Sequence, residues 1–221
     1  MIIFALLFSC SSNEVIHTTT KISSQEKQEE ATVAGPKIII VGDSLTAGLG
    51  VSSEAAYPNL VSSMLEDKGM PSQIINAGVS GDTTAGGLRR IDWVISQNPD
   101  LILIELGAND GLRGIPVSEV SSNLHDMIER VQTANIDVML IGMQIPPNYG
   151  KEYAKQFTEV FPSVSQQQGI PLLPFLLKDV AGVRDLNQPD GIHPTANGHE
   201  IIAQTVYDFL RSWRNSWSGS K

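Results

Sequence analysis

Cysteine is nearly absent from this chain of 221 residues, which contains only one. One cysteine cannot form an internal disulfide, and together with four histidines it is too few for a cysteine-rich zinc cluster. Basic residues are also scarce, since 15 Lys and Arg stand against 24 Asp and Glu and give a net charge of −9. An acidic chain lacks the positive surface that holds a polyanion, so nucleic acid is excluded as an expected partner.

Charged residues of either sign make up 18% of the chain, below the roughly 25% that is usual in soluble domains. Apolar residues make up 41%, which is enough to build a core and excludes bulk disorder. The length allows one domain of ordinary size with some residues left over. We therefore expect one folded domain whose stability comes from packing.

The longest uninterrupted apolar stretch at the N-terminus is short. Residues 1–10 read MIIFALLFSC, far fewer than the roughly 20 apolar residues that span a bilayer. The segment resembles a bacterial lipoprotein signal in which Cys10 becomes the lipidated first residue of the mature chain. That resemblance implies an exported protein, periplasmic or anchored to a membrane by lipid at Cys10. The alternative is an apolar N-terminus in which Cys10 has no role.

The next segment, residues 11–36, is rich in Ser, Thr, Gln, Glu and Lys and has little to bury. Such a composition predicts a flexible tether. Residues 37–221 contain no internal repeat or low-complexity stretch, so we treat them as one domain.

Short apolar runs alternate with longer amphipathic ones along this domain. The short runs predict five strands, at 37–41, 73–77, 100–106, 137–142 and 171–175. The longer ones predict helices at 57–68, 84–97, around 124–131, at 151–168 with a kink or break at Pro162, and at 195–213. This alternation predicts an α/β fold with a five-stranded parallel sheet covered on both faces.

Ligands of such sheets bind beyond the carboxyl ends of the strands, where this sequence places three polar segments, and a fourth opens the last predicted helix. They are GDSLTAG at 42–48, SGDT at 80–83, GAND at 107–110 and DGIHP at 190–194. Ser44 is a candidate nucleophile, but a serine hydroxyl needs a base. Of the four histidines, only His193 lies in a turn with an acid close by, because Asp190 precedes it by three residues. Asp190 could then orient the imidazole and stabilise imidazolium.

Acyl transfer by Ser44 would also require donors for the oxyanion. The candidates are the backbone amides of Ser44 and Gly81 and the side chain of Asn109. Asp43 and Asp110 stand beside these residues, and we assign them structural hydrogen bonds instead of acid-base work.

The four segments resemble, in order, the blocks of the GDSL or SGNH hydrolase family, named for Ser, Gly, Asn and His. The similarity extends over residues 37–210 and is closest to the bacterial esterase, thioesterase and lysophospholipase branch, often called arylesterases. It implies a three-layer α/β/α flavodoxin-like fold, no cofactor and no metal. It implies hydrolysis of small acyl esters or thioesters by the Ser44, Asp190 and His193 triad, with Ser44, Gly81 and Asn109 forming the oxyanion hole.

The resemblance also implies a mobile loop over the acyl chain at 107–112, which makes Leu112 a candidate substrate contact. Ile145, Pro146 and Tyr149 follow the fourth predicted strand, at the correct end to line an acyl groove. A rigid loop explains the same residues equally well. Trp93 lies within a predicted helix, and we expect it in the core.

Two other functions remain open from the sequence. A carbohydrate esterase that removes acetyl groups uses the same fold, although the matching loop segments favour the acyl-chain branch. A binding lipoprotein that keeps the fold without turnover is the other, and intact Ser44, Asp190 and His193 argue against it. The sequence gives no indication of the oligomeric state.

Overall fold

The computed structural model describes residues 35–219. The predicted signal segment with Cys10, and nearly all of the predicted tether, lie outside the described residues. The predicted domain begins at Lys37, which is also the first residue of the first strand.

Five parallel strands form one sheet in the order β2-β1-β3-β4-β5. The strands are β1 (Lys37–Gly42), β2 (Gln73–Gly78), β3 (Leu101–Glu105), β4 (Asp137–Ile141) and β5 (Leu172–Leu173). This order is that of flavodoxin-like sheets, in which β1 and β3 diverge at a switch point where ligands bind. The predicted fold class and sheet are therefore confirmed, with a fifth strand of only two residues.

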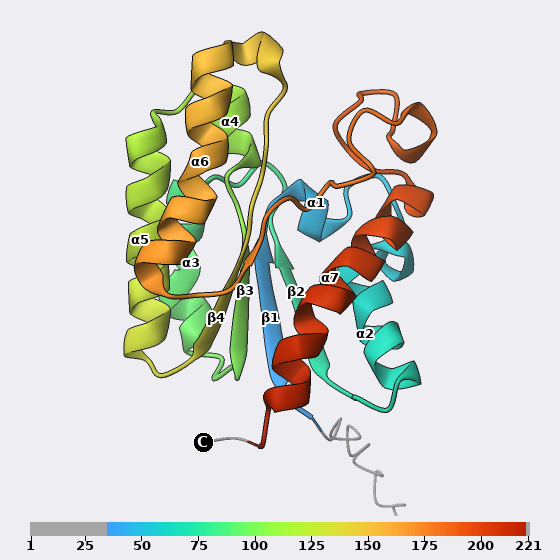
Figure 1. Cartoon of the computed structure of the whole chain (residues 1–221). Coiled ribbons are helices and arrows are strands. Elements are labelled where there is room, and N and C mark those ends of the chain that lie inside the picture. Colours follow the sequence, from blue (N-terminus) through green and yellow to red (C-terminus); the bar gives the residue numbers. More distant parts are fainter. Residues whose placement is uncertain (1–34, 220–221) are drawn as a thin grey trace, which may run out of the picture. The chain divides into compact units, whose positions relative to one another are not determined.

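Helices cover the two faces of the sheet, so the fold has three layers (Figure 1). One face carries α3 (Thr84–Ile95), α5 (Val117–Thr133) and α6 (Lys151–Gln168), and the other carries α2 (Tyr57–Asp67) and α7 (Ala196–Ser216). Shorter elements lie in the connections: α1 (Ser44–Ala47), α4 (Ala108–Arg113), η1 (Ser53–Ala55), η2 (Pro147–Tyr149) and η3 (Arg184–Leu186). Among residues 35–219, no helix combines the length and the hydropathy needed to cross a bilayer.

The central strands are buried on both sides because helices cover both faces. Every residue of β3 is buried, as are all residues of β1 except Lys37. The helix α6 runs through Pro162 without interruption, so the predicted break is wrong. Its Phe157 and Phe161 are fully buried and pack edge to face, and this burial holds the helix together where proline removes a backbone donor.

The turn between β1 and α1 determines where Ser44 lies. Asp43 caps α1 by accepting a hydrogen bond from the Leu45 amide, and Gly48 ends the helix with φ of 76°. Gly42 has no room for a side chain, because a Cβ atom there would overlap the Thr46 hydroxyl. Ser44 is therefore the first residue of a short helix that begins directly after the central strand.

Candidate active site

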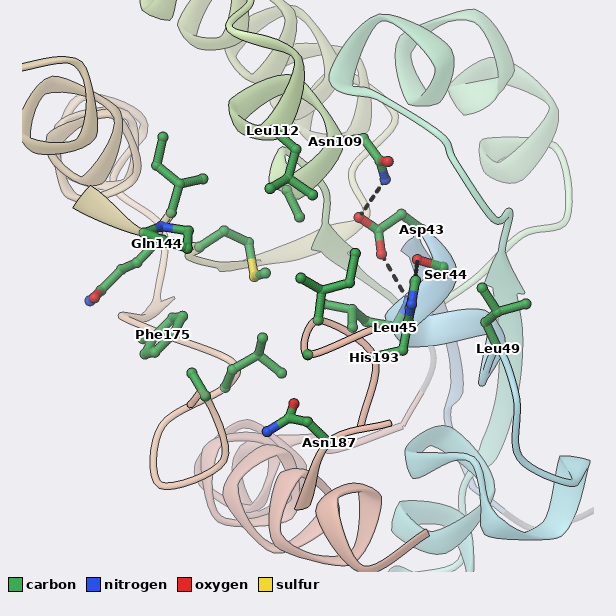
Figure 2. A pocket seen from close by; sticks show the side chains of 18 of the residues that line it. Asp43, Ser44, Leu45, Leu49, Asn109, Leu112, Gln144, Phe175, Asn187 and His193 are labelled. Carbon is green, nitrogen blue, oxygen red and sulfur yellow. Dashed lines mark hydrogen bonds between the residues drawn. The ribbon is translucent and has the colours of Figure 1, made fainter. Parts of the chain in front are cut away.

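The four polar segments predicted from the sequence meet at the carboxyl end of the sheet. Ser44, Gly81, Asn109 and His193 all line one cavity of about 660 Å³ (Figure 2). The volume lies within the range of small-molecule sites. The predicted convergence is thus present in the structure.

Ser44, His193 and Asp190 form a continuous line of hydrogen bonds. The Ser44 Oγ atom lies 2.9 Å from His193 Nε2, and His193 Nδ1 lies 2.8 Å from Asp190 Oδ2. The other oxygen of Asp190 accepts hydrogen bonds of 3.0 Å from the backbone amides of Ile192 and His193. The Ile192 amide, followed by the His193 ring, lowers the pKa of Asp190 to about 2, so the group is a carboxylate at neutral pH.

A carboxylate only accepts hydrogen bonds, so it places the imidazole proton on His193 Nδ1. His193 Nε2 is then the acceptor that faces the Ser44 hydroxyl. This tautomer can take a proton from Ser44, which is the arrangement that a serine nucleophile requires.

The three predicted oxyanion donors lie on three different segments around Ser44. The Ser44 amide is at the first turn of α1, where backbone amides have no partner within the helix. Gly81 follows β2 with φ of 81°, and its amide has no backbone acceptor among residues 35–219. The Asn109 side chain comes from α4 and donates to Asp43 Oδ2 over 3.1 Å. One of its two amide hydrogens is thereby left for a ligand.

Asp43 is fully buried beside this site. Burial raises its pKa to about 6, although the hydrogen bonds from Leu45 and Asn109 and the nearby His193 act in the opposite direction. The structural hydrogen bonds predicted for Asp43 and Asp110 are present, since Asp110 accepts from both the amide and the hydroxyl of Thr84.

A second buried acid, Glu105, lies beneath α1 at the end of β3. Its Oε2 atom accepts a hydrogen bond of 2.6 Å from the Thr46 hydroxyl, which also lies 2.7 Å from the hydroxyl of Tyr57. Burial, reinforced by the charge of Asp43, raises the pKa of Glu105 well above its ordinary value. Burial thus favours the protonated form of Glu105, and its hydrogen bond with Thr46 ties the end of β3 to the turn that carries Ser44.

The rest of the cavity wall is largely apolar. Leu112, Ile145 and Pro146 line it, as predicted for substrate contacts. Tyr149, the last residue of η2, does not line the cavity and is 43% exposed. Further apolar contributions come from Leu45, Leu49, Met143, Phe175, Leu177 and Ile192.

These further lining residues were not predicted as substrate contacts. Phe175 lies just beyond β5 and Met143 just beyond β4, so the rule that sites form after parallel strands could have selected both. Leu49 and Ile192 have no such signal, since they lie in irregular loops. Residues 35–219 contain no group of three or more His, Cys, Asp or Glu side chains placed to hold a metal ion.

A parallel sheet with a serine, a histidine and an aspartate aligned beyond its strands is the arrangement of a serine hydrolase. The chain belongs to the GDSL-like lipase/acylhydrolase family, whose profile matches residues 40–201. This match includes all four polar segments, so the predicted family is confirmed.

Named relatives agree with this membership. The chain is 39% identical over 177 residues to an arylesterase of Vibrio mimicus. The alignment covers 80% of this chain and 88% of the relative. Over 171 residues it is 36% identical to thioesterase 1/protease 1/lysophospholipase L1 of Escherichia coli K12, with coverages of 77% and 81%. The psychrotrophic esterase EstA of Pseudoalteromonas sp., solved as inhibited by monoethylphosphonate, superposes with a TM-score of 0.79 at 38% identity, covering 82% of this chain and all of the other.

Proposed function

We propose that this protein hydrolyses carboxylic esters or thioesters of small acyl substrates through an acyl-enzyme on Ser44. The observation that carries the proposal is the line from Ser44 Oγ through the His193 ring to the Asp190 carboxylate, which opens onto an apolar cavity. The relatives named arylesterase and thioesterase/lysophospholipase support the same reaction class.

In the first half-reaction, Ser44 Oγ attacks the carbonyl carbon while its proton passes to His193 Nε2. The carbonyl oxygen becomes an oxyanion, which accepts hydrogen bonds from the Ser44 amide, the Gly81 amide and the Asn109 side chain. Asp190 stabilises the imidazolium through the bond to Nδ1. The intermediate collapses when imidazolium donates its proton to the departing alcohol or thiol, and the acyl group stays on Ser44.

In the second half-reaction, His193 takes a proton from water, and the resulting hydroxide attacks the acyl-enzyme. The same oxyanion donors stabilise the second tetrahedral intermediate. Its collapse returns the proton from His193 to Ser44 Oγ and releases the carboxylic acid. No cofactor enters either step.

The cavity lining favours an acyl chain over a sugar as the group held beside Ser44. Leu112, Met143, Ile145 and Phe175 offer it apolar contacts, whereas a carbohydrate needs several polar partners. We therefore rank removal of acetyl groups from a carbohydrate second and a binding protein without turnover third.

The decisive test is the replacement Ser44→Ala. We expect hydrolysis of p-nitrophenyl butyrate and covalent labelling by a fluorophosphonate to disappear, while the circular dichroism spectrum stays that of the wild type. Ser63→Ala is the matched control, because Ser63 is exposed on α2 and only bonds its own helix. Turnover by Ser44→Ala at the rate of this control would refute the proposal.

A substrate panel then separates the candidate substrates. It contains p-nitrophenyl esters of increasing chain length, palmitoyl-CoA, a lysophospholipid and an acetylated xylooligosaccharide, compared by kcat/KM. A higher value on the acetylated sugar than on every acyl substrate would favour the carbohydrate esterase instead.

We further propose that the protein is exported and carries lipid on Cys10, which would hold the hydrolase at a membrane surface. The support is the apolar segment that ends at the only cysteine of the chain. Expression in a bacterial host with labelled palmitate should give a labelled product, and Cys10→Ser should abolish the label. Globomycin should make a precursor of the labelled protein accumulate. An unlabelled wild-type chain would contradict lipidation.

A further inference from the structure

The segment that carries Asp190 and His193 is closed into a hairpin by its own backbone. Asn187 and Pro194 form an antiparallel bridge at its base. Within it, the Gln188 amide donates to the His193 carbonyl over 2.7 Å, and the Gly191 amide donates to the Gln188 carbonyl over 2.9 Å. We call residues 187–194 the base hairpin. These bonds fix Asp190 relative to His193, but they do not fix either residue relative to Ser44.

The Gln188 side chain reaches across to the segment that carries the nucleophile. Its Nε2 atom donates to the Leu49 carbonyl over 2.7 Å and to the Pro194 carbonyl over 2.9 Å. The Leu49 amide in turn donates to the Ser44 carbonyl over 3.0 Å. The side-chain amide of Gln188 thus links the base hairpin to Leu49, whose own backbone amide bonds the Ser44 carbonyl.

No other hydrogen bond of the described residues duplicates this bridge. Between the base hairpin and residues 43–51, the structure contains the bond from Gln188 to Leu49 and the bond between His193 and Ser44. The base of the hairpin is buried at Asn187 and Pro194, and the Asn187 side chain donates to the carbonyls of Val180 and Val183. The tip at residues 189–192 is exposed, and the Asp190 side chain is 45% exposed. The buried base therefore ties the hairpin to residues 180–183, and the bond from Gln188 ties it to the segment that carries Ser44.

Gly50 makes room for the bridge. A Cβ atom at Gly50 would overlap the Gln188 side-chain amide, and Gly50 also has φ of 84°, which disfavours any other residue. Two positions 138 residues apart in sequence are therefore matched in shape as well as in hydrogen bonding.

We propose that Gln188 is a positioning residue that sets the distance between His193 Nε2 and Ser44 Oγ. The inference rests on the proposed function, because it assigns Gln188 to the same reaction. Gln188 does not line the catalytic cavity, so it acts through the hairpin and not on the substrate. A displacement of about 1 Å in a catalytic group can cost about 100-fold in rate, so one such bridge is enough to matter.

The test compares Gln188→Ala and Gln188→Glu with the wild type. Glutamate has the size of glutamine but no N–H to donate to two carbonyls, so packing is kept while the bridge is lost. We expect kcat on p-nitrophenyl butyrate, and the rate of fluorophosphonate labelling, to fall by about 10- to 100-fold in both variants. We expect KM to change by less than about twofold, because ground-state contacts remain.

Gln204→Ala is the matched control, since Gln204 is exposed on α7 and bonds only Asp208 of the same helix. Its kcat should equal that of the wild type. The proposal is overturned if Gln188→Glu has the kcat of this control, or if the loss lies in KM alone.

A double-mutant cycle with Gly50→Ala gives an independent readout. In the wild-type background the new Cβ atom displaces the Gln188 amide, whereas in Gln188→Ala no amide remains to be displaced. We expect Gly50→Ala to lower kcat much more in the first background than in the second, and equal losses would overturn the proposal. A wild type that neither hydrolyses esters nor reacts with the fluorophosphonate would instead refute the proposed function.

Discussion

The Asn109 side-chain amide donates to the Asp43 carboxylate over 3.1 Å, at the edge of the cavity that contains Ser44 (Figure 2). The bond orients a flexible primary amide with a buried acid from the neighbouring segment. It uses one of the two amide hydrogens and leaves the second for an oxyanion. The protonation state of Asp43 should therefore affect how the Asn109 side chain is oriented.

Asn109→Ala should lower kcat by about 100- to 1,000-fold, because a preorganised oxyanion donor contributes about that much in other hydrolases. KM for p-nitrophenyl butyrate should change little, since the donor acts mainly in the transition state. Steady-state kinetics measures both values. Asn59→Ala is the control, because Asn59 is a half-buried residue of α2 that does not line the cavity and bonds Ser53. Equal kcat in the two variants would exclude Asn109 from the oxyanion hole.

The acid side of the pH profile should report Asp43. Below about pH 6 the carboxylate gains a proton, and a protonated acid no longer offers Asn109 the same acceptor. His193 must also be unprotonated to act as a base. Protonation of Asp43 adds to this requirement, so kcat/KM should fall more steeply below about pH 6 than in a variant whose residue 43 cannot titrate.

Asp43→Asn removes the titration of residue 43. Its kcat/KM should be lower at every pH, and its acid limb should be shallower than that of the wild type. His193, Glu105 and Asp82 are the other ionisable groups near this position, and all three remain. Asp92→Asn, an exposed position that pairs with Arg130, should keep the wild-type slope. An acid limb in Asp43→Asn as steep as that of the wild type would show that Asp43 does not contribute to it.

Glu105 should make the folded state less stable as the pH rises. Its pKa is raised in the folded state by burial, whereas in the unfolded chain it ionises near its ordinary value of 4.5. The unfolded state therefore binds fewer protons above pH 4.5, and the contribution of Glu105 to stability is full below that pH and lost above it. Glu105→Gln lacks this titration.

Urea unfolding at pH 5 and pH 8 measures the effect. Relative to the wild type, Glu105→Gln should gain unfolding free energy between the two pH values. Glu66→Gln, at an exposed position on α2, should show no such gain. A difference between Glu105→Gln and the wild type that does not depend on pH would mean that Glu105 is ionised in the folded protein.

His199 should contribute to acid unfolding. It is buried under α2, its Nδ1 atom accepts from the Tyr57 amide over 3.3 Å, and its ring stacks on Tyr57. Burial lowers its pKa from 6.5 to about 4. Between these values the unfolded chain binds the proton first, so stability present above pH 6.5 is lost as the pH falls towards 4.

His199→Phe keeps the stacked ring and removes this titration. Thermal unfolding at pH 7.5 and pH 4.5 should show a smaller fall in Tm for His199→Phe than for the wild type. His125→Phe is the control, because His125 bonds Gln168 on a different face and should leave the fall unchanged. Each unit of pKa difference is worth about 1.4 kcal/mol, so the effect is within reach of calorimetry.

The sequence predicted the sheet and the four polar segments because both depend on short-range patterns. A run such as residues 37–41 can only be a buried strand in this context, and residues after parallel strands must meet at one edge. The position of Trp93 was predicted wrongly. Its side chain is 62% exposed, because Ile91 and Val94 form the buried face of α3 and Trp93 lies between them on the outer face.

The bridge from Gln188 to Leu49 could not be predicted from the sequence. Gln188 lies between an asparagine and a proline in an irregular segment, with no periodicity that shows where its side chain points. Its acceptor is a backbone carbonyl 139 residues away, which carries no side-chain signature. Glu105 was missed for a different reason, since it continues an apolar strand and its burial depends on the turn that packs above it.

Ser44 and His193, the proposed nucleophile and base, come from opposite ends of the domain and are separated by 149 residues. A growing chain therefore contains Ser44 long before the residue that can take its proton. A product of synthesis or proteolysis that stops before residue 193 lacks the proposed base. Hydrolysis through the line of Ser44, His193 and Asp190 therefore requires the chain as far as residue 193.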